Sequence, residues 1–336
     1  MNKIYIDSRW ENYGGIGTFY SEINKINNYE DAKLRGKPMS PFDCLSTTIQ
    51  LFFRKNGVFF FPGYIPPVFL KNNYIFTIHD LNHLDRPENS SLIKRLFYRT
   101  IVRRGCKKAK YVFTVSEFSR KKIIEWANIS PEKVINVSNG VSHKFRPEGE
   151  RSCYDFKYFL CVSNRKGHKN EIGLLEAFKK ARIDKNVKLV FTGKKNDFIA
   201  NKIIELNLED RIVFTGFVHE DELPKIYRSA IGLVFVSFYE GFGLPVIEAQ
   251  ASGIPVITSN TTALCEIAGN GAILVNPYNK NEISDAIEKI YNNDNNICEL
   301  LIEAGYINCA NYTWSKTAER VDFYINSALL NKSNFC

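Results

Sequence analysis

The sequence predicts a protein of the α/β class, built from two doubly wound domains with parallel sheets. The chain has 336 residues, which is enough for about two domains. Short, continuous apolar runs recur along it, as expected of strands buried on both faces of a parallel sheet. Several of these runs lead into glycine-containing turns and then into helical periodicity, which is the order of a βαβ unit. We therefore expect strands and helices to alternate along most of the chain.

Composition and cysteine usage restrict the class of protein further. Apolar residues make up 44% of the chain, so a large core can form. No apolar run approaches the roughly 20 residues that cross a bilayer, and none follows Met1 as a signal peptide would. The eight cysteines show neither C-x-x-C nor zinc-ligand spacing. A cytoplasmic protein without disulfides or bound metal is expected.

The formal net charge of +9 predicts acidic partners. Phosphates, anionic lipid surfaces and nucleic acid all fit such an excess. No zinc-finger, helix-turn-helix or RRM signature is present, so nucleic acid is the least favoured of the three.

The first strand and helix are expected around a glycine loop. Lys3–Asp7 has the pattern of a short strand, and Gly14–Gly17 opens a helix. Tyr20 stands where a dinucleotide-binding fingerprint has its third glycine, which disfavours an NAD dehydrogenase. The amides of Gly15 and Gly17 either face an anion or belong to an ordinary tight turn.

Two further buried strands are predicted at residues 57–61 and 74–79. His79 ends the second strand, and ligands of open α/β sheets bind beyond the carboxyl ends of strands. His79 is therefore placed to reach a substrate, although a lone histidine is usually only a capping or loop residue.

Residues 92–104 have helical periodicity, with an apolar face that includes Ile93 and Leu96. Arg95, Arg99 and Arg103 form a separate stripe at intervals of four residues. The stripe is either a solvated charged face or a dock for anionic lipid headgroups at the inner face of a plasma membrane.

The polar segment 146–155 is predicted to link the domains. We accordingly place the first domain at residues 1–150, the second at 151–313 and a last helix at 314–336.

A phosphate site is predicted where the run Ile231–Val236 ends. Gly241 and Gly243 supply a turn, and Pro245 suits the first position of a helix. The amides of Gly243 and Leu244 then point out of the helix N-terminus as an anion site.

Charged side chains complete this predicted site. Arg165 and Lys169 lie beside another helix N-terminus and would neutralise phosphate without a metal. Glu240 and Glu248 repel phosphate but accept hydrogen bonds from hydroxyls, so a nucleotide sugar satisfies the whole set. Taken singly, the two acids are also explained as a loop residue and a complement to the helix dipole.

The stretch EGFGLPVIE, residues 240–248, resembles the E-x7-E signature of the retaining glycosyltransferases of family 4, which have the GT-B fold. The segments ASGIPVITSN and GNGAILVNP, with Glu266 between them, continue the similarity. The resemblance implies two Rossmann-like domains facing a cleft, with acceptor binding in the first and nucleotide-sugar binding in the second. It also implies that the last helix crosses back to the first domain.

The resemblance assigns roles to individual residues. Glu240 would contact the donor sugar together with His79, and Glu248 would accept the ribose hydroxyls. The donor-binding set is Gly15, Gly17, Arg165, Lys169, Phe217, Val218, Gly241, Phe242, Gly243, Leu244 and Glu248. The backbone of Gly216–Val218 would frame the base, and no cofactor or metal is implied.

The resemblance favours GDP-mannose as donor, with UDP-hexoses and dTDP-rhamnose as alternatives. The acceptor would be a saccharide or lipid-pyrophosphate-linked saccharide in bacterial surface polysaccharide synthesis of the O-antigen type. Two other functions stay open: a nucleotide-sugar epimerase of the same fold and a non-catalytic nucleotide-sugar-binding protein.

Overall fold

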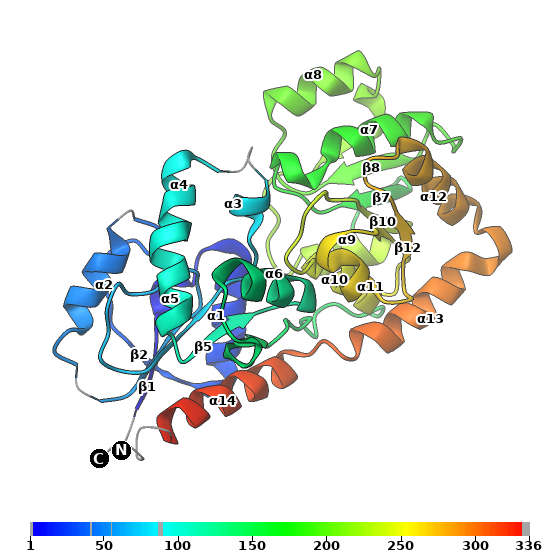
Figure 1. Ribbon diagram of the computed structural model, residues 1–336. Coiled ribbons are helices and arrows are strands. Elements are labelled where there is room, and N and C mark those ends of the chain that lie inside the picture. Colours follow the sequence, from blue (N-terminus) through cyan, green and yellow to red (C-terminus); the bar gives the residue numbers. More distant parts are fainter. Residues whose placement is uncertain (1–2, 41, 55, 87–89, 331–336) are drawn as a thin grey trace. The chain divides into compact units, whose positions relative to one another are not determined.

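The chain forms two compact units, each built on a parallel sheet (Figure 1). The computed structural model describes residues 3–40, 42–54, 56–86 and 90–330. The first unit comprises Met1–Gly140 with Trp314–Cys336, and the second comprises Val141–Thr313. Each sheet has six strands, so the predicted α/β class is confirmed.

The sheet of the first unit has the strand order β2-β1-β3-β4-β5-β6. The strands are β1 Ile4–Ile6, β2 Glu30–Asp31, β3 Val58–Phe61, β4 Tyr74–Thr77, β5 Tyr111–Thr114 and β6 Val134–Asn136. Every residue of β3 and β4 is buried, which explains why both segments are apolar without alternation. The parallel register pairs Phe59 with Tyr74 and Ile75 with Tyr111.

Helices surround this sheet. They are α1 Gly14–Asn27, α2 Asp43–Leu51, α3 Asn82–Asp85, α4 Leu92–Phe97, α5 Arg103–Lys108, α6 Glu117–Ala127 and α14 Trp314–Leu330. The side chain of Asn27 donates to the carbonyl of Ala318 at 3.0 Å, which ties α14 to the end of α1. Trp314–Leu330 thus belongs to the first unit, while residues 331–336 lie outside the described part.

The helix predicted over residues 92–104 is interrupted. A π-helical segment, Tyr98–Val102, separates α4 from α5. Its wider turn breaks the interval of four residues, so the expected arginine stripe is not continuous. The Nε atom of Arg103 donates to the carbonyl of Ala127 at 3.4 Å, whereas Arg99 is exposed. No helix of the described residues is both long and apolar enough to cross a membrane.

The sheet of the second unit has the order β12-β11-β10-β7-β8-β9. The strands are β7 Tyr158–Cys161, β8 Lys188–Phe191, β9 Ile212–Phe214, β10 Gly232–Phe235, β11 Val256–Ser259 and β12 Ile273–Val275. β7 and β10 are neighbours, and the chain leaves them in opposite directions across the sheet. Such a switch point opens a crevice at the carboxyl ends of the two strands, where open α/β sheets bind ligands.

The second unit buries apolar side chains in a layer on each face of its sheet. Its helices are α7 Glu171–Lys180, α8 Asp197–Glu205, α9 Leu223–Ser229, α10 Leu244–Ala251, α11 Thr262–Ala268, α12 Lys280–Asn292 and α13 Ile297–Cys309. Along β7, Phe159 packs in one layer while Tyr158 and Leu160 pack in the other. This alternation places α7 with α12 in one layer and α9 with α10 in the other.

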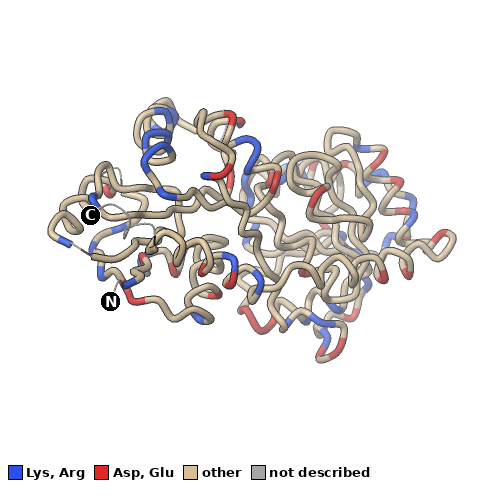
Figure 2. Tube along the Cα trace, turned by 60° about the horizontal axis from the view of Figure 1, so that its bottom comes forward, with Lys and Arg blue, Asp and Glu red and all other residues tan. Residues whose placement is uncertain are grey.

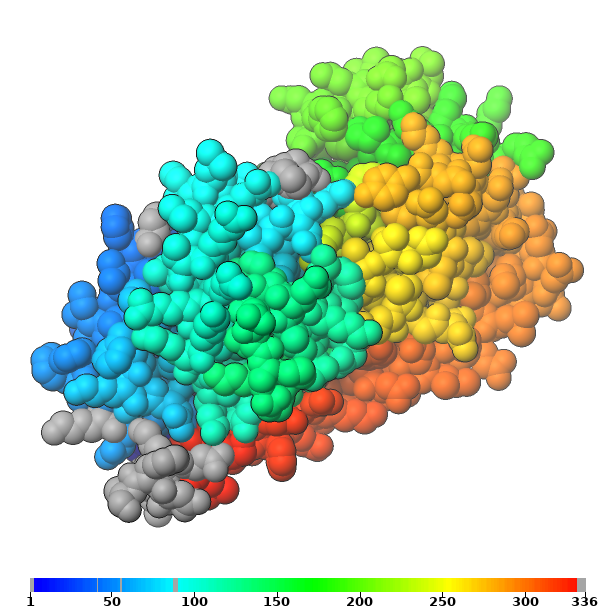
Figure 3. Space-filling model, viewed as in Figure 1, coloured from blue at the N-terminus to red at the C-terminus, as the bar shows by residue number. Residues whose placement is uncertain are grey.

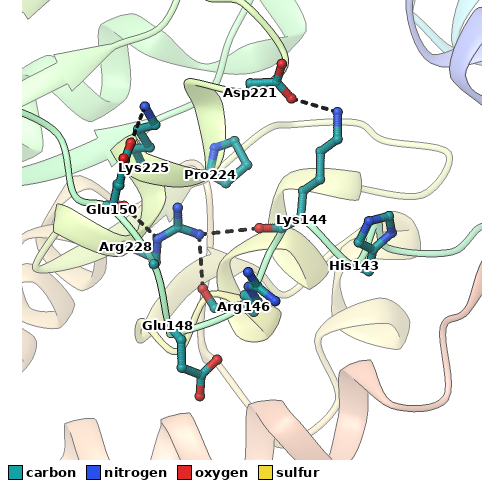
Figure 4. A pocket seen from close by; sticks show the side chains of 10 residues that line it. His143, Lys144, Arg146, Glu148, Glu150, Asp221, Pro224, Lys225 and Arg228 are labelled. Atoms are coloured by element: carbon teal, nitrogen blue, oxygen red, sulfur yellow. Dashed lines mark hydrogen bonds and ion pairs between the residues drawn. The ribbon is translucent and has the colours of Figure 1, made fainter.

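The predicted linker is an ordered part of the second unit, so the domain boundary after residue 150 is wrong. The buried guanidinium of Arg228 donates to the carbonyls of Glu150 at 2.9 Å, Arg146 at 3.2 Å and Lys144 at 3.3 Å (Figure 4). Arg151 in turn donates to the carbonyl of Arg228 at 2.7 Å. The polar composition of residues 146–155 suggested a linker. Composition does not indicate that an arginine distant in the sequence donates hydrogen bonds to the carbonyls of this segment.

Replacing Arg228 should therefore loosen this segment. Arg228→Ala leaves three carbonyls without their donor, and we expect it to destabilise the second unit by about 2–4 kcal/mol. Urea denaturation followed by circular dichroism measures the loss, and hydrogen exchange over residues 141–155 should rise. Arg146→Ala is the matched control, because that side chain is exposed and only its carbonyl is used. Equal effects of the two substitutions would contradict the assignment.

Candidate nucleotide-sugar site

An ion pair lies at the switch point of the second sheet. Lys169 ends the 3₁₀ turn Gly167–Lys169 after β7, and Glu240 follows β10. The Nζ atom of Lys169 lies 2.7 Å from Oε1 of Glu240, and the two side chains are only 15% and 13% exposed. The backbone amide of Glu240 donates to the hydroxyl of Thr262 at 3.3 Å. The structure therefore brings together the predicted phosphate-binding lysine and the predicted sugar-binding acid.

The glycine turn next to this pair opens α10. Gly243 precedes the helix with a φ of 109°, and an added Cβ would lie 2.5 Å from the side chain of Leu264. Only glycine fits there, because the left-handed backbone and the close packing both exclude a side chain. Within the described residues, the amides of Gly243 and Leu244 have no acceptor, as expected at a helix N-terminus. They keep the donors that an anion site needs.

The neighbouring turn residues have different surroundings. Gly241 lies in the same turn, and the ring of Phe242 is buried edge-on against Tyr312 with centroids 5.7 Å apart. The side chain of Phe242 therefore has a packing role, which leaves only its backbone for a donor contact.

Glu248 lies in the second turn of α10 rather than in the first. The phenol of Tyr227, on α9, donates to its Oε2 atom at 2.7 Å. Burial raises the pKa of Glu248 to about 7, although the hydrogen bond from Tyr227 acts in the opposite direction. Sequence reasoning missed Tyr227, because nothing in the spacing of α9 connects it with the glutamate 21 residues later.

Arg165 has partners other than the members of this ion pair. Its guanidinium is paired with the carboxylate of Glu171 and with the carbonyl of Thr192. It also lies over the rings of Phe191 and Phe214, 5.2 and 5.1 Å from their centroids. The expected convergence of Arg165 with Lys169 is absent from this arrangement, because a neighbouring acid neutralises the guanidinium first. The predicted contact of Arg165 with pyrophosphate stays a prediction.

The loop after β9 carries the residues predicted to frame a base. Gly216 accepts a hydrogen bond from the amide of Gly193 at 3.0 Å, which joins the loops after β8 and β9. Phe217 is 78% exposed, whereas Val218 packs against the core. The backbone of this loop lies at the carboxyl edge of the sheet, as expected, and the contact with a base stays a prediction.

In the first unit, His79 lies just after β4 with its ring edge-on to Phe19. Its Nε2 atom is 3.0 Å from the carbonyl of Pro62, so Nε2 carries the proton and Nδ1 is left as an acceptor. Burial lowers the pKa of His79 to about 4. The imidazole is therefore neutral at physiological pH and can accept a hydrogen bond from a hydroxyl.

The two glycines of the first unit are not equivalent. An added Cβ at Gly17 would lie 2.2 Å from the carbonyl oxygen of Glu11, and the amide of Gly17 donates to Tyr13 at 3.3 Å. Gly17 thus has a packing reason to be glycine, and its amide is already used. Around Gly15 there is open space, and its amide has no acceptor in the described part of the chain.

Comparison with known proteins identifies the family of this chain. The profile of the family "Glycosyl transferases group 1" matches residues 147–307, and that of "Glycosyltransferase Family 4" matches residues 58–145. The O-antigen chain mannosyltransferase B of Escherichia coli is 27% identical over 265 residues, 74% of this chain and 69% of that protein. The O-antigen chain mannosyltransferase RfbU of Salmonella typhimurium is 32% identical over 225 residues, 66% of this chain and 62% of that protein.

Solved structures share the fold. A glycosyltransferase from Rickettsia africae superposes with a TM-score of 0.75 at 16% identity, over 98% of this chain and 99% of that one. The two Rossmann-like units are those of the GT-B fold. The chain belongs to the group 1, family 4 glycosyltransferases.

The half-buried, neutral histidine has a measurable signature. In a nitrogen NMR titration of the labelled imidazoles, His79 should keep the Nε2–H tautomer and gain a second proton only near pH 4. The unfolded chain binds that proton near pH 6.5, so the first unit should lose stability as the pH falls from about 6.5 towards 4. His79→Gln identifies the resonance by its loss. A midpoint near the ordinary value would contradict the burial argument.

Proposed function

We propose that this protein transfers a hexose from a nucleoside diphosphate sugar, with retention of anomeric configuration, and that GDP-mannose is the donor. The acceptor is a saccharide or lipid-pyrophosphate-linked saccharide of O-antigen-type synthesis. The Lys169–Glu240 pair beside the α10 amides is the observation that carries the proposal. The two mannosyltransferase relatives support the choice of mannose and of the O-antigen class.

In the proposed reaction, the residues of the second unit hold the donor. Lys169 and the amides of Gly243 and Leu244 bind the diphosphate and stabilise the charge that develops on the departing nucleotide. This arrangement needs no metal ion. Glu240 accepts hydrogen bonds from hydroxyls of the sugar, and Glu248 accepts hydrogen bonds from the ribose hydroxyls.

The remaining steps need no nucleophile from the protein. The leaving phosphate accepts the proton of the acceptor hydroxyl as the new glycosidic bond forms. In the first unit, the neutral state of His79 suits a hydrogen bond from a sugar hydroxyl to Nδ1. The two rival functions are separated by product analysis: an epimerase converts the nucleotide sugar without acceptor, and a binding protein releases no nucleotide.

Two substitutions within the ion pair separate its roles. Lys169→Ala removes a charge-assisted phosphate contact, so affinity for GDP should fall about 10-fold or more by calorimetry. Glu240→Gln should lower the transfer rate about 100-fold or more while nucleotide affinity is kept or rises, because Lys169 then lacks its carboxylate partner. Full transfer by Glu240→Gln, or unchanged affinity in Lys169→Ala, would refute these roles.

Thermal-shift measurements with GDP-, UDP- and dTDP-sugars identify the donor.

We further propose that the first unit binds the surface of an anionic membrane. Leu92, Ile93 and Leu96 on α4 are 84%, 81% and 61% exposed, although the periodicity of this segment suggested an apolar face. Basic residues gather on the same segment and on α5 after it, namely Arg95, Arg99, Arg103, Arg104, Lys107 and Lys108 (Figure 2). Exposed apolar side chains beside such a cluster suit the boundary of a bilayer with anionic headgroups.

The first unit has a second exposed apolar stripe, on and beside α2. It consists of Phe42, Leu45, Ile49, Phe52 and Phe53. The amide of Phe69 lies 3.4 Å from the hydroxyl of Thr48 on α2, and Nζ of Lys108 on α5 lies 5.5 Å from the ring centroid of Phe69. These contacts connect α2 with the end of α5 through Phe69, and Figure 3 shows the α2 and α4 segments on the outside of the unit.

Liposome co-sedimentation tests the membrane proposal. Ile93→Ser and Arg99→Ser should each reduce binding to vesicles that contain phosphatidylglycerol, and added salt should weaken the wild type, since each surface basic residue contributes about 1 kcal/mol. Ile307→Ser is the matched control, because Ile307 is a 70% exposed isoleucine of the second unit. Binding that is unchanged in both test variants would refute the proposal.

A further inference from the structure

The phenol of Tyr227 is a buried polar group with one hydrogen-bond partner among the described residues. Its side chain is completely buried, and its hydroxyl donates to Oε2 of Glu248 at 2.7 Å. The ring is fixed edge-on by Phe145, with centroids 5.4 Å apart, and by the apolar layer that α9 shares with α10. A buried hydroxyl without a hydrogen-bond partner is destabilising, so the contact is persistent.

This hydrogen bond gives the two oxygens of the Glu248 carboxylate different roles. Oε2 is taken by Tyr227, whereas Oε1 has no hydrogen-bond partner among the described residues. The side chain is thus held in one orientation, with one oxygen left to accept hydrogen bonds.

The charge state of Glu248 depends on few neighbours. In the described part of the chain, Glu248 makes no ion pair. Burial raises its pKa to about 7, and the hydrogen bond from Tyr227 acts the other way. The thiol of Cys161 on β7 also influences Tyr227, but burial raises the pKa of that thiol as well, so it is uncharged. Tyr227 is therefore the group that favours the ionised carboxylate.

We propose that Tyr227 is a positioning residue, which keeps Glu248 ionised and presents its Oε1 atom to the ribose hydroxyls of a nucleoside diphosphate. This inference rests on the proposed function, because it takes the ribose to be the ligand of Glu248. An ionised carboxylate accepts hydrogen bonds from hydroxyl donors, whereas a protonated one has lost part of that capacity. Nucleotide binding should therefore need the ionised form.

The sign of the pH dependence follows from this requirement. Nucleotide affinity of the wild type should fall as the pH drops through about 7, where Glu248 takes up a proton. Removing the phenol hydroxyl deletes a hydrogen bond that favours the charged form, so the midpoint should move upward. The substitution should matter most near neutral pH and least in alkaline solution.

Tyr227→Phe is the direct test, with calorimetric affinity for GDP and UDP measured between about pH 5.5 and pH 9. We expect the midpoint to rise by about one unit and the affinity at neutral pH to fall about 5–10-fold, with recovery at the alkaline end. Glu248→Gln should bind weakly with no such midpoint. Tyr158→Phe is the matched control: Tyr158 is buried in the same layer, but its hydroxyl donates to the carbonyl of Ile226 at 2.7 Å, so it should leave the midpoint unchanged.

A measurement without nucleotide separates this inference from the proposed function. In a carbon NMR titration of labelled glutamate carboxyls, the resonance lost in Glu248→Gln should titrate near pH 7 in the wild type and higher in Tyr227→Phe. A shift of less than about 0.3 unit would overturn the positioning role, whatever the protein binds. A full shift in a protein that binds no nucleoside diphosphate would overturn the ribose assignment and the proposed function, and would leave the Tyr227–Glu248 coupling standing.

Discussion

The neutralisation of Lys169 by Glu240 is the interaction on which the proposed site depends. Both side chains are largely removed from water, and either charge would be costly to bury alone. The pair exists because β7 and β10 are neighbours, which brings the loops after them to one edge of the sheet. In the proposed function, the diphosphate of the donor replaces Glu240 as the counter-ion of Lys169. That exchange frees the carboxylate for the hydroxyls of the sugar, so binding of phosphate and binding of sugar are coupled.

The two glutamates of the E-x7-E stretch are held by different chemistry. Glu240 is balanced by a cation, whereas Glu248 is balanced by a neutral phenol. A lysine paired with a carboxylate can exchange that carboxylate for a phosphate, because both partners are anions. A carboxylate held by a buried tyrosine keeps its partner and offers its second oxygen. The α10 turn joins the two, since Gly243 closes against Leu264 and so fixes the start of the helix that carries Glu248.

Much of the fold and part of the site follow from local signals. The apolar runs of β3, β4 and β10 are continuous because their strands are buried on both faces, and the amino-acid sequence alone displays this pattern. Gly243 and Pro245 likewise mark the start of α10. Three expectations differ from the fold for a common reason: a linker at residues 146–155, one regular helix at residues 92–104, and Arg165 as a neighbour of Lys169. In each case contacts or a change of helix type that the composition does not report decide the outcome, namely the hydrogen bonds of Arg228, the π-helical turn, and the pairing of Arg165 with Glu171 and the carbonyl of Thr192.

The sequence by itself determined the α/β class, the order of the elements, the glycine turn before α10 and the membership of the two glutamates in one motif. These features depend on periodicity and on backbone preferences, which act over a few neighbouring residues. Only the tertiary structure decided which charged groups face one another. Arg165 is paired with Glu171, Lys169 with Glu240, and Tyr227 with Glu248, and each choice depends on which strands and helices become neighbours. Charge pairing is set by distance in space, and spacing along the chain does not report that distance.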